Sequence, residues 1–324
     1  MLLDDRYGRV ATDLRVSLTD RCSLRCSYCM PPEGLPWLPK DEILTDAEVI
    51  RLVGIATGLL GVTEVRYTGG EPLLRPGLVE IVRQTPVHTS LTTNAIGLSR
   101  LAVPLAEAGL ARVNVSLDTL DRDRFVALAH RDRLADTLAG IEAAAAAGLT
   151  PVKLNTVLMR GVNEDEAPAL LQFALDHGYE LRFIEQMPLD AQHGWSRDNM
   201  VTATEILESL SGFGLTPDLS TVRGSAPAET WLVGGGPARV GVIASVTRPF
   251  CGDCDRTRLT ADGQVRNCLF ARGESDLRTP MRAGASDAEL AALWRTAMWG
   301  KLPGHGIDNP AFLQPDRPMS SIGG

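Results

Sequence analysis

Short apolar and β-branched runs alternate with longer amphipathic stretches from residue 12 to about residue 190. The runs predict strands at Asp13–Leu18, Val62–Thr68, His88–Thr93, Arg112–Leu117, Val152–Leu158 and Glu180–Gln186. Apolar positions at helical spacing between them predict helices at Asp46–Leu60, Pro76–Gln84, Ser99–Ala108, Leu134–Ala147 and Glu164–His177. Strands that alternate with helices are typical of parallel sheets with right-handed crossovers. The regular repeat therefore predicts an α/β fold, an incomplete TIM-like (β/α) barrel.

The pattern changes near residue 195, where we place a boundary between residues 1–195 and residues 196–324. Glycine and proline interrupt the second region often, which is typical of turns between short elements. Its apolar patterns predict helices at Thr202–Ser211, Glu274–Ala283 and Asp287–Trp299, strands at Arg239–Val246 and Arg258–Arg266, and an extended tail from Asp308. An Asp262-Gly263 turn would fold the strand around it into a hairpin.

Composition narrows the class of protein. The chain has 40 acidic and 32 basic residues, a formal net charge of −8 and 44% hydrophobic residues, which is ordinary globular usage. Polar and charged residues interrupt every apolar run before the roughly 20 residues that a membrane span needs, and the N-terminus has no signal-peptide pattern. An acidic chain is also a poor general nucleic-acid binder. We therefore expect a cytoplasmic globular protein with no membrane and no nucleic-acid partner.

The cysteines are grouped in two distant triplets. They are Cys22, Cys26 and Cys29, and then Cys251, Cys254 and Cys268. Six cysteines could form three disulfides, but disulfide frameworks belong mainly to small secreted domains. Clustered cysteines in an intracellular chain more often bind metal or carry out redox chemistry. The grouping therefore favours two metal or redox sites.

The first triplet, Cys22-x3-Cys26-x2-Cys29, directly follows the first predicted strand. On a helix the three side chains would share one buried face, but Pro31 and Pro32 make a continuing helix unfavourable. A structural zinc site needs four ligands, and no fourth cysteine or histidine lies nearby in the sequence. Three thiolates can instead bind three irons of a [4Fe–4S] cluster and leave the fourth iron open. This spacing resembles that of the radical S-adenosylmethionine (SAM) enzymes.

A glycine-rich segment, Thr68-Gly69-Gly70-Glu71-Pro72, ends the second predicted strand. Glycine lets the backbone approach a ligand closely, and a carboxylate can offset a nearby ammonium group. The alternative is a tight turn that Glu71 caps. The segment resembles the one that contacts the amino group of SAM in radical SAM enzymes. Both motifs follow strand C-terminal ends, where (β/α) barrels assemble their active sites.

The second triplet, Cys251-x2-Cys254-x13-Cys268, again supplies three thiolates. A second cluster with an open iron is the simpler interpretation. A zinc site stays open as an alternative, although the candidate fourth ligands His193 and His305 are far away in the sequence.

Basic residues gather around the second triplet, although the chain as a whole is acidic. They are Arg248, Arg256, Arg258 and Arg266. Arg256 and Arg258 are two apart in a predicted strand, so their side chains point to the same face. Arginine is a good bidentate phosphate ligand, so the pair suits a polyanion such as a nucleoside triphosphate. Isolated surface arginines, in contrast, are usually only solvated.

Five segments carry a resemblance that extends from Leu14 to the C-terminus. They are Leu14-Arg-Val-Ser-Leu-Thr-Asp-Arg-Cys22, Thr68-Gly-Gly-Glu-Pro-Leu-Leu-Arg75, Leu181-Arg-Phe-Ile-Glu-Gln-Met-Pro188, Cys251-Gly-Asp-Cys-Asp-Arg-Thr-Arg258 and Gly323-Gly324. The chain is similar to the radical SAM GTP 3′,8-cyclase family of molybdenum cofactor biosynthesis. The resemblance implies a partial barrel of the radical SAM type, with a C-terminal extension that carries a second iron–sulfur site.

The resemblance also implies two [4Fe–4S] clusters and SAM as cofactors. A one-electron reductant would cleave SAM at the first cluster to methionine and a 5′-deoxyadenosyl radical. In the family this radical abstracts the ribose 3′ hydrogen of GTP, and the resulting carbon radical attacks C8 of guanine. The product is (8S)-3′,8-cyclo-7,8-dihydroguanosine 5′-triphosphate, which a separate cyclic pyranopterin monophosphate synthase consumes. The second cluster would hold the guanine, and a homodimer is also implied.

Matching positions imply the site residues. GTP-binding positions are Arg15, Arg66, Thr92, Lys153, Arg182, Arg256, Thr257 and Arg258. SAM-binding positions are Tyr28, Gly69, Gly70, Glu71, Ser116 and Met187. The positions tied most closely to catalysis are Arg15, Arg256, Arg258, Gly323 and Gly324. In the family the double-glycine tail reaches into the active site; a frayed terminus is the alternative.

Two positions depart from the family pattern without removing a ligand. Ser23 replaces an asparagine that is common after the first cysteine. Ala95 stands where glycine is usual, which argues against a left-handed backbone there.

Other functions remain open from the sequence. A radical SAM enzyme with an auxiliary cluster could modify a peptide, but Arg15, Arg256 and Arg258 favour a phosphate-bearing substrate. A non-catalytic iron–sulfur carrier or a zinc-stabilised binding protein is a further alternative. A carrier cluster is expected to have four cysteine ligands, whereas each triplet supplies three.

Overall fold

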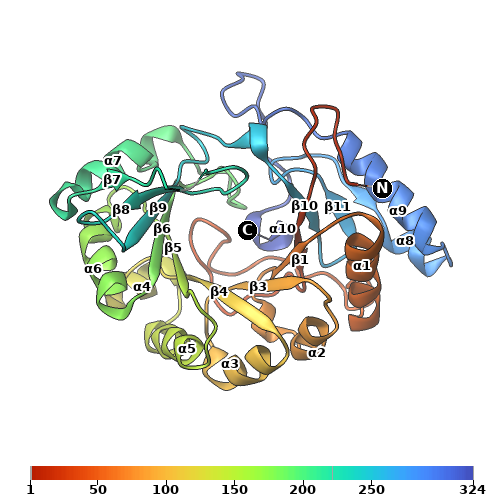
Figure 1. The fold of residues 1–324 in the computed structure, drawn as a ribbon, viewed down its shortest axis with the longest axis horizontal. Coiled ribbons are helices and arrows are strands. Elements are labelled where there is room, and N and C mark those ends of the chain that lie inside the picture. Colours follow the sequence, from red (N-terminus) through yellow and green to blue (C-terminus); the bar gives the residue numbers. More distant parts are fainter. Residues whose placement is uncertain (1, 221, 324) are drawn as a thin grey trace.

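The chain folds into a curved sheet with helices along its outer side (Figure 1). The computed structural model describes residues 2–220 and 222–323. The sheet has twelve strands and is open, in the order β12-β11-β10-β1-β2-β3-β4-β5-β6-β9-β8-β7. The predicted incomplete (β/α) barrel is therefore confirmed.

The strands are short and the helices lie between them in the sequence. The strands are β1 (Asp13–Ser17), β2 (Glu64–Thr68), β3 (His88–Thr93), β4 (Leu110–Ser116), β5 (Lys153–Val157), β6 (Glu180–Ile184), β7 (Thr216–Pro217), β8 (Glu229–Leu232), β9 (Arg239–Ile243), β10 (Arg256–Leu259), β11 (Gln264–Arg266) and β12 (Ser275–Asp276). The α-helices are α1 (Asp46–Leu59), α2 (Leu78–Arg83), α3 (Leu98–Glu107), α4 (Arg122–Ala129), α5 (Leu134–Ala146), α6 (Ala167–His177), α7 (Ala203–Ser209), α8 (Arg278–Arg282), α9 (Asp287–Trp299) and α10 (Met319–Ile322). Short 3₁₀ turns are η1 (Pro72–Leu74), η2 (Glu164–Glu166), η3 (Arg197–Asn199), η4 (Ser211–Phe213) and η5 (Cys251–Asp253).

The C-terminal region extends the barrel at both edges. Strand β9 pairs in parallel with β6, and β10 pairs in parallel with β1. Strands β10 and β11 form the expected antiparallel hairpin around the Asp262-Gly263 turn. The division at residue 195 stays a prediction, and one sheet crosses it.

Alternating side chains in the strands separate a core from an inner cavity. In β1, Leu14 and Val16 are buried in the apolar core with helix residues such as Leu52. Strand geometry turns the intervening Arg15 and Ser17 to the opposite side, the inner face of the barrel. The barrel interior is therefore polar, while the apolar core lies between the sheet and the helices.

Some predicted elements are wrong or incomplete. Helix α4 was missed because its eight residues carry a weak apolar stripe. The predicted helix Glu274–Ala283 is shorter, because Ser275–Asp276 pair as β12. The tail is not extended throughout, since α10 forms one helical turn before Gly323.

Ala95 has a left-handed backbone after all, with φ of 63°. Its N–H donates to the Thr93 hydroxyl oxygen at 2.9 Å, and its carbonyl accepts from the Leu98 N–H at 3.0 Å. These contacts hold a conformation that alanine adopts at a cost of about 1 kcal/mol. The expectation that alanine would exclude this conformation is therefore wrong.

In the part of the chain that the structure describes, every helix is too short or too polar to cross a bilayer.

Candidate active site

The first cysteine triplet lies on the loop after β1 and faces a cavity between the ends of β1 to β4. Cys22, Cys26 and Cys29 line this first-triplet cavity together with Gly69 and Gly70. Burial raises the pKa of Cys22 to about 11 and that of Cys29 to about 12. Free thiols here would stay protonated at neutral pH, whereas bound metal favours thiolates.

The two glycines let the backbone after β2 pass very close to the cysteine loop. A Cβ at Gly70 would lie 2.3 Å from the carbonyl oxygen of Arg21, and one at Gly69 would lie 2.5 Å from that of Thr19. Gly69 also has φ of 136°, a region that favours glycine. A side chain at either position would displace the loop that carries the cysteines.

Glu71 is buried and both of its carboxylate oxygens accept hydrogen bonds from the protein. Thr93 Oγ1 and the Leu73 N–H donate to Oε1 at 2.7 and 3.0 Å, and the Asn94 N–H donates to Oε2 at 2.8 Å. Burial raises the pKa of Glu71 to about 7, and these donors oppose that shift. Glu71 thus caps η1, as the alternative interpretation expected; its contact with an ammonium group stays a prediction.

Tyr28 and Asp118 connect the cysteine loop to the end of β4. The Tyr28 hydroxyl donates to Asp118 Oδ2 at 2.7 Å, and the Val157 N–H donates to Oδ1 at 2.9 Å. Burial raises the pKa of Asp118 to about 6. Asp118 was not predicted as a site residue, although its position one residue beyond the predicted strand Arg112–Leu117 was the available signal.

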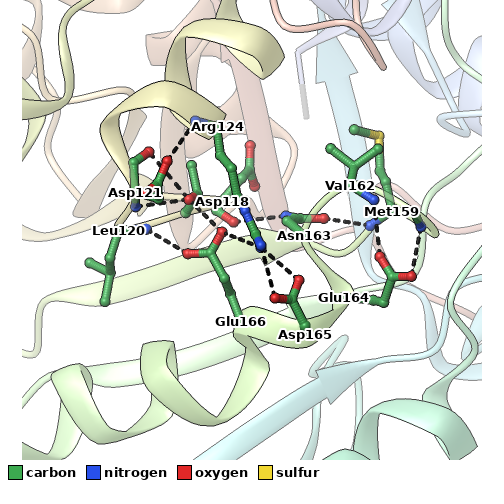
Figure 2. A network of polar contacts seen from close by, with 12 residues as sticks. Asp118, Leu120, Asp121, Arg124, Met159, Val162, Asn163, Glu164, Asp165 and Glu166 are labelled. Atoms are coloured by element: carbon green, nitrogen blue, oxygen red, sulfur yellow. Dashed lines mark hydrogen bonds and ion pairs between the residues drawn. The ribbon is translucent and has the colours of Figure 1, made fainter.

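A polar network holds Asp118 from the outside (Figure 2). The fully buried Asn163 donates from Nδ2 to the carbonyl of Asp118 at 2.7 Å and accepts the Met159 N–H at 2.8 Å. Glu166 accepts from the Leu120 N–H at 3.0 Å and from Arg124 at 3.1 Å. The ends of β4 and β5 and the start of α4 are therefore fixed together behind Asp118.

The second cysteine triplet faces a neighbouring cavity, and Lys301 lies against it. Cys251, Cys254 and Cys268 line this second-triplet cavity, whose empty volume is about 970 Å³ and includes space open to solvent. Burial opposes ionisation of Cys254, but Lys301 and Arg256 outweigh it and lower the pKa of this thiol. Lys301 Nζ lies 3.4 Å from Cys254 Sγ and donates to the Arg256 carbonyl at 2.9 Å. Lys301 was missed because it lies 47 residues from Cys254.

His305 also lines this cavity, but its two ring nitrogens already have partners. Nε2 lies 3.1 Å from the Ser245 carbonyl, and Nδ1 lies 3.1 Å from the Ile307 N–H. Across residues 2–220 and 222–323, no three His, Cys, Asp or Glu side chains gather like the ligands of one metal ion. Each triplet supplies three cysteines, one ligand fewer than a structural zinc site needs.

Arginines on the inner side of the sheet line the second-triplet cavity, and Arg15 and Arg258 among them are buried. Arg15, Arg66 and Arg258 lie on the inner faces of β1, β2 and β10 and line the second-triplet cavity. Burial and the neighbouring charges of Arg15 and Arg256 lower the pKa of Arg258 to about 9. Guanidinium groups stay charged in proteins, so the lowered pKa reports an unfavourable crowding of cations. The buried Nε atoms of Arg15 and Arg182 lack a hydrogen-bond partner among the described residues.

Arg256 and Thr257 point to opposite sides of β10. Arg256 faces the cavity, stacks on the Phe250 ring at 4.9 Å and donates to the Ser225 carbonyl at 2.6 Å. The Thr257 hydroxyl instead accepts from the Trp294 indole at 2.9 Å, on the α9 side of the sheet. The structure therefore does not bring the Thr257 side chain into the cavity with its neighbours.

The remaining sequence-based site residues divide between the cavities. Thr92 lines both, so the two cavities share a wall at the end of β3. Ser116 lines the first-triplet cavity, whereas Met187 and Arg182 line the second-triplet cavity. Lys153 lies further along, in a cavity next to the second one and at 2.6 Å from Glu180.

The C-terminal tail enters the barrel, where Figure 1 shows it near α10 at the centre. The Gly323 carbonyl accepts a hydrogen bond from Arg258 at 2.5 Å, and the Ile322 carbonyl accepts one from Ser17 at 2.9 Å. Gly323 has φ of 81°, which favours glycine. Gly323 is thus brought to the site, and Gly324 lies outside the described residues.

Ser23 and Asn94 meet beside the first triplet. Asn94 Nδ2 donates to Ser23 Oγ at 3.0 Å and lies 3.8 Å from Cys22 Sγ. The replacement of asparagine by serine therefore keeps a polar contact at this position.

Family profiles match nearly the whole chain. The Radical SAM superfamily profile matches residues 16–174, and the Molybdenum Cofactor Synthesis C profile matches residues 179–307. A GTP 3′,8-cyclase from Streptomyces coelicolor is 66% identical over 100% of this chain and 96% of its own length. The chain belongs to the GTP 3′,8-cyclase family. Other relatives with this name are 56% identical in Corynebacterium glutamicum, over 100% of this chain and 89% of the relative, and 58% identical in Mycolicibacterium smegmatis, over 99% and 92%.

Solved structures support the fold of this GTP 3′,8-cyclase family member. Streptococcus suis SuiB bound to SAM aligns with a TM-score of 0.60 and 14% identity, over 93% of this chain and 69% of SuiB. SuiB bound to its precursor peptide aligns with a TM-score of 0.59 and 13% identity, over 90% and 66%. At this identity the likeness concerns the fold alone.

Membership of the radical SAM superfamily implies one [4Fe–4S] cluster and SAM in this GTP 3′,8-cyclase family member. The first-triplet cavity fits both groups, because three thiols and two close-approach glycines line it. Cys22, Cys26 and Cys29 would hold the cluster, and Gly69 and Gly70 would offer backbone groups to SAM.

Proposed function

We propose that this chain is a radical SAM enzyme that cyclises GTP between ribose C3′ and guanine C8 for molybdenum cofactor biosynthesis. The observation that carries the proposal is the wall that the two triplet cavities share at Thr92. One cavity suits a cluster with SAM, and the other offers thiols and buried arginines to a nucleotide. A reactive group held in one cavity would therefore lie next to a substrate held in the other.

In this reaction the chain's own residues would orient SAM, bind the triphosphate and exclude water. When bound, the cluster and SAM supply a 5′-deoxyadenosyl radical that removes the ribose 3′ hydrogen. Tyr28, Gly70 and Ser116 would orient SAM, since all three line the first-triplet cavity. Met187 would contact SAM from the second-triplet cavity, which it lines. Enclosure within the barrel would keep water away from the reactive species.

The buried arginines would bind the triphosphate. Arg15, Arg66 and Arg182 bring positive charge into the cavity that Asp13 and Glu180 offset only in part, and burial lowers the pKa of all three. A polyanion would relieve that cost and would meet the unpartnered Nε donors of Arg15 and Arg182. A peptide-modifying enzyme, the alternative within this class, has no evident need for this row of cations.

A second [4Fe–4S] cluster at Cys251, Cys254 and Cys268 would hold the guanine base. Lys301 and Arg256 favour a thiolate at Cys254, which supports metal binding there. Arg258 would link this end of the substrate to the tail, because it also binds the Gly323 carbonyl. Thr257 would contribute through its backbone alone, and Gly324 would extend the tail.

The decisive experiment incubates anaerobically reduced protein with SAM and GTP. We expect 5′-deoxyadenosine together with a cyclised GTP. If the same amount of 5′-deoxyadenosine forms with and without GTP, and GTP stays unchanged, the proposal is contradicted. Iron and sulfide analysis is expected to give about eight irons per chain, four for each cluster. Bound zinc without labile sulfide would instead favour the zinc-stabilised alternative.

Matched variants separate the two triplets. Cys22→Ala is expected to abolish SAM cleavage, because it removes a ligand of the first cluster. Cys251→Ala is expected to keep the first cluster and lose GTP cyclisation. Arg256→Ala is expected to weaken GTP binding and to retain iron at both sites, since its guanidinium contacts the cavity wall. Equal iron loss from both sites in Arg256→Ala would count against this assignment.

Partners and location belong to the same proposal. A one-electron reductant would act on the first cluster, and a cyclic pyranopterin monophosphate synthase would consume the product. We also propose a homodimer in the cytoplasm, and a division of the chain into residues 1–195 and residues 196–324.

A further inference from the structure

Arg112 lies in a row of positions that crosses five neighbouring strands. In register, Arg258 pairs with Arg15, Arg15 with Arg66, Arg66 with Ser90, and Ser90 with Arg112. Paired positions on adjacent strands point to the same face of a sheet. Ser90 is the small member of the row and accepts a hydrogen bond from Arg66 Nε at 3.2 Å. Arg112 therefore continues the row of arginines on the inner face, at its partly exposed end.

The cavities place Arg112 at the far end of the nucleotide site. Arg15, Arg66, Arg182 and Arg256 line both the second-triplet cavity and a further cavity, which we call the rim cavity. Arg112 and Lys153 also line the rim cavity. Its empty volume is about 820 Å³ and includes space open to solvent. The two cavities therefore adjoin along these four arginines, with the cysteines of the second triplet in the one and Arg112 in the other.

Arg112 is held loosely by its protein neighbours. One terminal nitrogen lies 3.2 Å from His88 Nε2, and the other lies 3.6 Å from Glu64 Oε2. Paired guanidinium and carboxylate groups usually approach to about 2.8 Å. The side chain of Arg112 is 20% exposed, against 9% for Arg15. The guanidinium can therefore take a further anion at the rim without leaving its place.

The pKa shifts of the neighbouring basic residues also favour an anion at the rim. Burial lowers the pKa of Lys153, and the charges of Arg182 and Arg112 lower it further. Burial and Arg15 lower the pKa of Arg66, and Arg112 adds to that effect. Asp13, Glu64 and Asp255 also line the rim cavity and offset part of this charge, as does Glu180 beside Lys153, but the basic residues that line it outnumber these carboxylates. An anion bound among these cations would be strongly favoured.

We propose that Arg112 binds the terminal phosphate of the nucleotide and makes the enzyme select a triphosphate over a diphosphate. This inference rests on the proposed function, in which the base lies at the second triplet. The phosphates would then pass Arg15 and Arg66 in the deep part of the cavity. The third phosphate reaches the rim, where Arg112 supplies a charge-assisted hydrogen bond that a diphosphate is too short to use.

The test measures dissociation constants of GTP and GDP by calorimetry on anaerobic, cluster-loaded protein without reductant. Arg112→Gln is expected to weaken GTP binding about tenfold, the loss of one charge-assisted hydrogen bond. Its GDP binding is expected to stay within about twofold, so the preference for GTP largely disappears. Arg112→Lys keeps the charge and is expected to restore part of the preference.

Two controls separate a phosphate ligand from a structural ion pair. Glu64→Gln removes the carboxylate partner of Arg112 and is expected to leave GTP binding unchanged or tighter. Arg83→Gln removes an exposed arginine that pairs with Glu80 and is expected to change neither nucleotide. Equal losses for GTP and GDP in Arg112→Gln, or a Glu64→Gln variant that behaves in the same way, would overturn the proposal. If the wild-type protein binds GTP more tightly than GDP but does not cyclise it, the proposed function is contradicted. The comparison of the Arg112 variants still tests the role of Arg112 in phosphate binding.

Discussion

At the residue scale, one of the hydrogen bonds that join the first cysteine loop to the rest of the barrel comes from the side chain of Tyr28. The Tyr28 hydroxyl reaches Asp118, 90 residues away in the sequence, at 2.7 Å. Asp118 is in turn fixed by the Val157 N–H and by Asn163 on its carbonyl (Figure 2). The loop between Cys26 and Cys29 is therefore positioned by side chains that bind no metal.

Tyr28→Phe tests this connection. The change leaves one oxygen of the buried Asp118 carboxylate without its donor, so the free energy of unfolding is expected to fall by about 1–2 kcal/mol. Denaturant unfolding of the apo chain measures the loss. Iron analysis of the reconstituted protein is expected to show weaker retention at the first triplet than at the second.

Tyr7→Phe is the matched control for this variant. Tyr7 is exposed and its ring lies under Arg9, so removal of its hydroxyl is expected to change stability by less than about 0.5 kcal/mol. Similar losses in the two variants would show that the Tyr28 hydroxyl has no special role.

At the residue scale, the sequence points to candidate site residues where they lie close together along the chain. The first triplet and the two glycines could be found because close spacing along the chain marks them. Asp118, Lys301 and Arg112 act through contacts with distant segments, so no spacing identifies them. A motif match says nothing about the side of the strand that a residue faces, and the Thr257 side chain faces Trp294; its contact with GTP stays a prediction.

At the scale of elements, helices α3 and α5 pack unusually closely through one glycine. A Cβ at Gly140 in α5 would lie 2.2 Å from the Ala95 carbonyl oxygen, just before α3. The left-handed backbone of Ala95 places that carbonyl against α5. The two unusual positions therefore depend on each other.

Gly140→Ala is expected to destabilise the protein by roughly 2 kcal/mol, because the clash with backbone exceeds the gain in helix propensity. Gly54→Ala in α1 is the control, since nothing lies within 4 Å of its Cβ position. That change is expected to stabilise by about 0.5–1 kcal/mol. Urea unfolding midpoints measure both, and stabilisation by Gly140→Ala would contradict the close packing.

An ion pair between α1 and α8 is expected to make stability depend on acid pH. Arg282 binds both carboxylate oxygens of Glu48 and, with the Thr45 capping contact, lowers the pKa of Glu48 from 4.5 to about 2. A lowered pKa in the folded state stabilises above the unfolded pKa, and this contribution is lost as pH falls toward 2.

Glu48→Gln measures that contribution. At neutral pH the variant is expected to be about 1 kcal/mol less stable than the wild type, a value typical of a partly exposed pair. The difference is expected to narrow as the pH approaches about 3. Urea unfolding measures both proteins at neutral pH and at about pH 3. If the difference in unfolding free energy is the same at both pH values, the charge of Glu48 does not cause the stabilisation.

Helices and strands were predicted best where the apolar pattern in the sequence is long and regular. The long amphipathic helices α1, α5 and α9 were found almost to their observed ends, because burial of one helix face leaves a clear period. Short α4 and the two-residue strands β7 and β12 leave no such period. The pairing of β9 with β6 and of β10 with β1 depends on how the barrel closes, which a local pattern does not encode.

At the scale of the whole molecule, the C-terminal tail lies at the barrel centre, near the adjacent strands β10 and β1 (Figure 1). Gly323 meets β10 through Arg258, and the residue before it meets β1 through Ser17. Met319 and Ser320 on α10 also line the first-triplet cavity. The tail thus contacts the walls of both cavities.

Gly323→Ala is expected to displace this tail. The new Cβ would lie 2.5 Å from Ser17 Oγ and 2.6 Å from Thr68 Cγ2, in a backbone conformation that alanine disfavours. A misplaced group at a reacting centre can cost 10- to 100-fold in rate, so GTP cyclisation is expected to fall by about that factor. Carboxypeptidase digestion is expected to remove the displaced tail faster than the wild-type tail.

Gly178→Ala separates the effect of the tail from backbone strain alone. Gly178 has φ of 70°, close to that of Gly323, and nothing lies within 4 Å of its Cβ position at the end of α6. Both variants are therefore expected to lose about 1 kcal/mol of stability, while only Gly323→Ala loses cyclisation activity. Because the tail leaves the three cysteines of each triplet in place, iron content is expected to be normal in both. Full activity in Gly323→Ala, with a tail that resists carboxypeptidase, would mean that the barrel centre accommodates the methyl group and that the tight fit of Gly323 has no bearing on catalysis.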